Sequence, residues 1–113
     1  MSRPPAPRVQ PADFSELEAS AQAAARLMKL LANEQRLQLL CRLLRGEASV
    51  GDLAQYAKLA QSAVSQHLAK MRAEGMVATR RVAQTIFYRL DDQATVRVLD
   101  TLREIYRDAP AAG

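Results

Sequence analysis

Residues 49–90 read SVGDLAQYAKLAQSAVSQHLAKMRAEGMVATRRVAQTIFYRL, and the elements predicted here define the architecture of the chain. Its first part predicts a short helix, because Ser49 and Asp52 have the spacing of a capping box. A tight turn is predicted over residues 58–60, and a second helix over 61–74. A short helix, a tight turn and a second helix in this order are typical of a helix-turn-helix.

A β-hairpin is predicted directly after this unit. Gly75 ends the helix, and the period of apolar residues then changes from 3.6 to 2. The runs 76–81 and 85–90 therefore predict two strands, with Arg80 and Arg81 near the tip of their hairpin. A hairpin in this place makes the unit a winged helix-turn-helix, a class that binds duplex DNA.

The helix over 61–74 carries two unlike faces. Val64, Leu68 and Met71 share one face and are expected in the core, whereas the opposite face is short, polar and basic. Short polar side chains reach base edges and cations hold phosphates, although a merely solvated amphipathic face is the alternative. The residues expected to contact DNA are Gln61, Ser62, Ser65, Gln66, His67, Lys70, Arg80, Arg81 and Gln84.

The positive charge of the chain is concentrated in the same region. The 113 residues carry a net charge of +4. Residues 58–89 hold six basic side chains and one acidic one, which is +5, so the rest of the chain carries −1. Such clustering indicates a nucleic-acid-binding face, the alternative being an unevenly charged solvated surface.

The rest of the chain adds helices around this unit within one domain. Further helices are predicted from Asp13 or Ser15 onward, over 34–45, and from Asp91 or Asp92 to about Arg107. The fold class is therefore α+β and mostly α, with five helices and a two-stranded wing. The expected organisation is a flexible proline-rich arm (1–12), the winged helix-turn-helix domain (13–108) and a disordered tail (109–113).

Two apolar stripes predict a dimer. The first helix repeats apolar residues at intervals of 4, 3, 4 and 3, which is a heptad seam with small alanines in its middle. The last helix carries a second stripe. The first and last helices are therefore expected to pair across a two-fold axis. The residues concerned are Leu17, Ala21, Ala24 and Met28, and then Val98, Leu99, Leu102, Ile105 and Tyr106.

Three segments carry a resemblance to a known family. LLANEQRLQLL (30–40), QSAVSQHL (61–68) and the wing ending in FYRL (87–90) resemble the arsenic-repressor (ArsR/SmtB) family, over roughly residues 15–107. The resemblance implies a homodimeric DNA-binding transcriptional regulator and not an enzyme, usually a repressor that a metal or a thiol-reactive inducer releases from operator DNA. Lys58 and Ala60 depart from it, standing where the family often has Gly and a capping Ser or Thr.

No metal site or other cofactor is expected. Metal-sensing members of the family place cysteines on the third helix, where this chain has Ser49 and Gly51, or Asp and His ligands on the last helix. Zinc needs three or four converging ligands, and the chain offers one cysteine, Cys41, and one histidine, His67. A metal-responsive repressor with an unrecognised site is kept as an alternative.

Cys41 and its neighbours resemble the branch of the family that includes the biofilm-growth-associated repressor and related sulfide and redox sensors. Those relatives imply a second cysteine near the end of the last helix, where this chain has Arg107. Three interpretations of Cys41 therefore stay open. It is a buried core residue, or a one-cysteine switch for reactive sulfur or oxidant species with its pKa lowered by Arg107 or Arg42, or the site of an intermolecular disulfide.

Other classes of function are weighed against DNA binding. A dimeric protein-interaction adaptor or anti-repressor that keeps the fold would show no steep salt-dependent binding to any duplex. A thiol enzyme would need a base beside Cys41, and the sequence offers no such pair. No apolar run approaches the ~20 residues of a membrane helix, so no membrane partner and a cytoplasmic location are expected. The family contains repressors and activators, and the sequence does not separate them.

Overall fold

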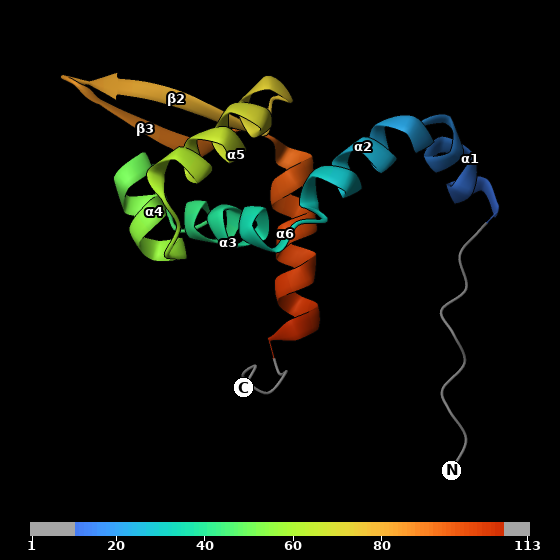
Figure 1. Cartoon of the computed structure of the whole chain (residues 1–113). Helices are drawn as coiled ribbons and strands as arrows, with labels where there is room; N and C mark the ends of the chain where they lie inside the picture. Colours follow the sequence, from blue (N-terminus) through green and yellow to red (C-terminus); the bar gives the residue numbers. More distant parts are fainter. Residues whose placement is uncertain (1–10, 108–113) are drawn as a thin grey trace, which may run out of the picture.

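The computed structural model describes residues 11–107, which form six helices and a three-stranded antiparallel sheet (Figure 1). In chain order the elements are α1 (Pro11–Ala19), α2 (Ala21–Leu31), α3 (Glu34–Leu43), β1 (Ala48–Ser49), α4 (Val50–Ala57), α5 (Gln61–Ala73), β2 (Val77–Val82), β3 (Thr85–Leu90) and α6 (Gln93–Tyr106). This order confirms the winged helix-turn-helix. The tail expected over 109–113 and most of the expected arm lie outside the described residues.

The first predicted helix is wrong in two respects. It begins at Pro11 rather than at Asp13 or Ser15, and it is broken at Ser20 into α1 and α2. Ser20 has φ −103° and ψ 13°, outside the helical region, and its side chain caps neither piece. The predicted heptad seam therefore crosses a bend in the chain, and Leu17 and Ala21 lie on different helices.

The sheet has one strand more than the sequence predicts. Ala48 and Ser49 form β1, which pairs with Tyr88 and Phe87 of β3, so the strand order is β1-β3-β2. Two residues give no measurable period of apolar side chains, which is why the pattern did not reveal this strand. The short strand connects the start of the helix-turn-helix to β3 of the hairpin. The hairpin of β2 and β3 is called the wing.

The core holds α3, α4, α5 and the base of the wing together. Its largest fully buried side chains are Leu39, Leu40, Leu53, Val64, Leu68, Met71, Met76 and Thr95. Burial of each large apolar side chain stabilises the fold by about 1.5–3 kcal/mol. Val64, Leu68 and Met71 of α5 have no exposed surface, which confirms the predicted inner face. The outer face of α5 is thereby fixed toward solvent.

After α2, the helix starts follow the predicted caps, but one predicted helix ends early. Asn33 and Asp92 cap α3 and α6, and Ser49 with Asp52 forms the predicted capping box of α4. The predicted helix over 34–45 instead ends at Leu43. Its last residues enter a turn in which the Gly46 N–H donates to the Leu43 carbonyl at 3.1 Å. Gly46 has φ +134°, a conformation that glycine adopts without strain.

Figure 1 shows how the other elements surround the helix-turn-helix and its wing. In this view α5 lies between the wing above it and α3 below it. Helix α6 runs vertically beside them, and α2 and α1 extend away to the right. The described residues extend over 57 × 37 × 20 Å along their principal axes. Among the helices of residues 11–107, none is long and apolar enough to cross a membrane.

Candidate nucleic-acid interface

The outer face of α5 presents the polar side chains that the sequence singled out. Gln61, Ser62, Ser65 and Gln66 are exposed, and so is Lys70 on the same helix. No residue of this set forms a hydrogen bond or ion pair that joins it to another element of the described chain. The hydroxyl and amide groups are therefore available to base edges, which is what a helix in the major groove requires.

The turn before α5 departs from an ideal helix-turn-helix as the sequence suggested. Lys58 has φ +56° and ψ +47°, the left-handed conformation, and the Leu59 N–H donates to the Ala54 carbonyl at 3.0 Å. A residue with a Cβ costs roughly 1 kcal/mol in this conformation. Ala60 is the N-cap of α5 and offers no side-chain acceptor to the first helical N–H groups.

His67 is held by α3 and does not point freely outward. Arg36 Nε donates to His67 Nδ1 at 3.4 Å, and Nε2 lies 3.0 Å from Gln35 Oε1. Because Nδ1 accepts, Nε2 carries the proton and donates to Gln35. Burial, followed by the charges of Arg36 and Lys70, lowers the pKa of His67, so the ring is neutral near pH 7. Both ring nitrogens are thus engaged within the chain, and contact with a base would require one of these bonds to open.

The two arginines of the wing have different surroundings. Arg80 Nε pairs with the Glu47 carboxylate at 2.8 Å, and its guanidinium lies 5.4 Å from the centre of the Phe87 ring. Arg81 is exposed at the tip, where its Nε donates to the Ala83 carbonyl at 3.1 Å. Consecutive strand residues point to opposite faces, which separates the two side chains. Arg81 is the better placed of the pair for a phosphate, since Glu47 already neutralises Arg80.

Arg36 and Glu47 are two residues of the interface that the sequence analysis missed. Arg36 also donates to the Leu30 carbonyl at 3.0 Å, so one side chain joins the end of α2, the start of α3 and the middle of α5. Its contact with His67 spans 31 residues, and the Glu47–Arg80 pair spans 33. Periodicity and local motifs carry no information at such separations.

Comparison with known proteins now decides the family. A family model described as bacterial regulatory protein, arsR family, matches residues 33–79. The transcriptional activator HlyU of Vibrio cholerae is 44% identical over 99 residues, which cover 88% of this chain and 92% of HlyU. The chain belongs to the ArsR family. It is a DNA-binding transcriptional regulator of that family and not an enzyme.

Solved structures of ArsR-family proteins share the fold. The structure of reduced HlyU from Vibrio cholerae has a TM-score of 0.76 at 46% identity and covers 80% of this chain and 96% of its own. The transcriptional repressor BigR from Xylella fastidiosa has a TM-score of 0.78 at 38% identity, covering 82% and 95%. The biofilm growth-associated repressor of Agrobacterium fabrum is 39% identical over 105 residues, which cover 88% of this chain and 90% of that protein. Identity therefore does not single out the repressor branch, because an activator is at least as similar.

Cys41 of this ArsR-family chain is not a core residue. Its neighbour Leu40 is fully buried, but Cys41 is exposed, which contradicts its interpretation as a buried packing residue. Partial burial raises the pKa of the Cys41 thiol, so the expected lowering by Arg107 or Arg42 is also wrong. Arg107 pairs with Glu104 at 3.3 Å, and Arg42 donates to the Gly46 carbonyl at 3.4 Å.

Cys41 lies in an apolar hollow of about 620 Å³ between α3, α4 and α6. The hollow is lined by Leu37, Cys41, Leu44, Arg45, Tyr56, Leu99, Leu102, Arg103 and Tyr106. No residue of α5 takes part in it, so the cysteine lies away from the face predicted to contact DNA. Within the described residues no three His, Cys, Asp or Glu side chains come together around a common point.

The two stripes predicted for a dimer differ in how far a single chain covers them. Leu17 and Met28 are 56% and 59% exposed, and Ile105 and Tyr106 are 62% and 65% exposed. Leu99, in contrast, is buried within the chain and therefore contributes to its own core rather than to a surface. Of the remaining residues, Ala21 is exposed, whereas Ala24, Val98 and Leu102 are half-buried. ArsR-family proteins bind operator DNA as dimers, and large exposed apolar side chains are typical of a surface that a partner covers.

Proposed function

We propose that this ArsR-family protein is a homodimeric repressor that occupies operator DNA by inserting α5 of each protomer into a major groove. The observation that carries the proposal is the outer face of α5, where four short polar side chains are exposed over a fully buried inner face. Ser62, Ser65 and Gln66 would contact base edges, while Lys70 and Arg81 would contact phosphates. The exposed Leu17, Met28, Ile105 and Tyr106 support the dimer.

The division of roles between base and phosphate contacts is tested by fluorescence anisotropy. The probe is the DNA upstream of the protein's own gene, with a scrambled duplex of the same length as reference. We expect Ser65→Ala to reduce the preference for the upstream duplex by about 0.5–1.5 kcal/mol, the usual net contribution of one hydrogen bond. Arg81→Ala should weaken binding to both duplexes alike and lower the salt slope by about 1.8, because each protomer of the dimer loses one phosphate contact. Equal loss of preference in both variants would contradict the assignment.

Repression is distinguished from activation by a promoter reporter with and without the protein. Occupation of a promoter by a repressor predicts that expression rises when the protein is removed. A fall in expression would instead place the protein with relatives such as the transcriptional activator HlyU. The DNA-binding assignment would stand in either case.

We further propose that operator binding does not respond to oxidation or sulfur modification of Cys41, the chain's one cysteine, which cannot form a disulfide within one chain. The thiol with its raised pKa supports a weak response to mild oxidants. The same anisotropy assay is run on reduced and polysulfide-treated protein, with Cys41→Ser as control. Unchanged binding supports the proposal. Loss of binding that Cys41→Ser prevents would instead establish a one-cysteine or intermolecular switch.

A further inference from the structure

A basic hollow lies beside the recognition helix α5, formed largely by residues outside the basic segment 58–89. It has a volume of about 430 Å³ and opens where the end of α2 and the start of α3 meet the second half of α5. Its lining residues are Arg26, Lys29, Leu30, Ala32, Asn33, Arg36, Lys70 and Glu74. We call this site the basic hollow. Three of its four cations, Arg26, Lys29 and Arg36, come from α2 and α3.

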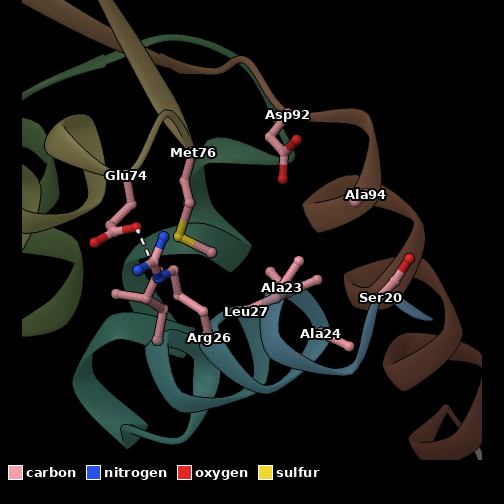
Figure 2. A pocket seen from close by; sticks show the side chains of 10 residues that line it. Ser20, Ala23, Ala24, Arg26, Leu27, Glu74, Met76, Asp92 and Ala94 are labelled. Atoms are coloured by element: carbon pink, nitrogen blue, oxygen red, sulfur yellow. Dashed lines mark ion pairs between the residues drawn. The ribbon is translucent and has the colours of Figure 1, made fainter. Parts of the chain in front are cut away.

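The charge of the basic hollow is strongly positive. Four cationic side chains face a single carboxylate, Glu74, which leaves a net charge of +3. Arg26 is paired with Glu74, as Figure 2 shows, but at 4.0 Å and with its side chain 69% exposed, so water screens the pair. Burial, and then the charges of Arg36 and Lys70, lower the pKa of the neighbouring His67, so this ring adds no charge to the region near pH 7.

Two of the four cations are uncommitted. Arg36 is held by the Leu30 carbonyl and by His67, as described above. Lys29 and Lys70 are exposed, and neither forms a hydrogen bond or an ion pair within residues 11–107. An ammonium on a flexible stem is a good point-charge contact for a phosphate. The hollow therefore offers two available ammonium groups in a field that Arg26 and Arg36 make more positive.

The position of the basic hollow beside α5 fits the sugar–phosphate backbone of DNA. Lys70 and Glu74 are four residues apart, so they share one flank of α5, and Lys70 borders the outer face that carries Ser62 and Gln66. A helix that lies in a major groove about 12 Å wide has a sugar–phosphate strand along each of its flanks. The hollow occupies the flank turned toward α2 and α3.

We propose that the basic hollow binds the DNA backbone beside the recognition helix, with Lys29 and Lys70 as its phosphate contacts. The inference rests on the proposed DNA-binding mode of α5 and extends the interface to α2. Its contribution is independent of base sequence, because phosphates are the same at every step. It fixes the register of α5 in the groove, and a dimer presents two such hollows.

The decisive variant is Lys29→Gln, because Lys29 lies outside the helix-turn-helix and the wing. Affinity for the upstream and scrambled duplexes is measured by anisotropy over a series of salt concentrations. Loss of one phosphate contact lowers the slope of log K against log[salt] by about 0.9, so loss of one per protomer lowers it by about 1.8. Across a four-fold rise in salt, the wild-type dimer should then lose about 12-fold more affinity than the variant.

The matched control is Arg45→Gln, which removes the same charge from an exposed site. Arg45 lies over the Tyr56 ring at 5.8 Å and lines the apolar hollow, which contains no residue of α5. Its slope should stay close to that of the wild type. Glu74→Gln is a second test whose expected result, tighter binding, cannot arise from a loss of folding. Removal of the carboxylate should tighten binding to both duplexes by about three-fold.

The outcomes separate this inference from the proposed function. If the wild type binds duplexes with a steep salt slope while Lys29→Gln keeps that slope, the basic hollow makes no phosphate contact and the inference fails alone. If Lys29→Gln and Arg45→Gln lower the salt slope equally, the effect reflects net charge alone, and the inference is also overturned. If the wild type binds neither duplex, the DNA-binding mode of α5 fails, and the inference fails with it. Thermal unfolding followed by circular dichroism verifies that each variant is folded.

Discussion

The start of the recognition helix offers a prediction whose magnitude the structure supplies. Three other helices begin with a side-chain acceptor. Asn33 accepts from the Arg36 N–H at 3.0 Å, Ser49 from Asp52 at 3.1 Å, and Asp92 from Thr95 at 3.1 Å. The N-cap of α5, Ala60, has extended backbone angles of φ −65° and ψ 145°. The backbone of Ser49, at φ −80° and ψ 167°, is similar, so a serine at position 60 can make the same bond.

We expect Ala60→Ser to stabilise the protein by about 1 kcal/mol, the usual difference between serine and alanine at an N-cap. Ala60 is exposed, so the added hydroxyl meets no packing obstacle. For a domain of this size, that free energy raises the melting temperature by about 4–8 °C. Urea and thermal unfolding followed by circular dichroism measure it. Protein concentration is held fixed, because the apparent stability of a dimer depends on it.

Ala69→Ser is the control, since it makes the same chemical change at an exposed position in the middle of the same helix. Serine is a weaker helix former than alanine there, so a loss of up to about 0.5 kcal/mol is expected. The two variants should therefore differ in sign. If Ala60→Ser is no more stable than Ala69→Ser, the first N–H groups of α5 gain nothing from an acceptor, and the capping argument is refuted.

Three further predictions concern other residues. Lys58→Gly should raise the free energy of unfolding by about 0.5 kcal/mol in urea, because relief of the left-handed strain exceeds the cost of the added chain entropy. Gln55→Gly within α4, where no such strain exists, should instead lower the free energy of unfolding. His67 has its pKa lowered on folding, so the free energy of unfolding should be constant above about pH 6.5 and fall below it as the unfolded chain takes up the proton. Urea titrations between about pH 7 and pH 5 should show a smaller fall in the free energy of unfolding for His67→Gln than for the wild type. An identical pH dependence in the two proteins would show that His67 is not its source. Cys41, with a raised pKa, should be alkylated by iodoacetamide more slowly in the folded protein than in urea at neutral pH, and a faster folded-state reaction would show an activated thiolate.

Local signals in the sequence were sufficient for most of the fold. The capping box at Ser49 with Asp52, the stop at Gly75 and the change of period after it are determined by neighbouring residues, and the structure has all three features in place. The inner face of α5 also follows from spacing alone. The break at Ser20 did not, because no strong helix breaker stands there and residues on both sides favour a helix.

The surroundings of individual side chains could not be predicted in the same way. The exposure of Cys41 depends on how α3 lies against α4 and α6, and its place in an apolar stripe suggested burial instead. Arg80 looked equivalent to Arg81 until the fold brought Glu47 beside it. Such pairings join residues more than thirty positions apart, so only the packed chain defines them.

Local sequence signals are sufficient to specify a winged helix-turn-helix with a polar outer face on α5. Those features arise from periodicity, caps and turns, which act within a few residues. Which charges remain available depends on tertiary packing. The packed chain pairs Arg80 with Glu47, holds His67 against Arg36, and places Lys29 and Lys70 around one hollow. The physical reason is that electrostatic and hydrogen-bonding partners are set by distance in space, which the linear order of residues does not encode.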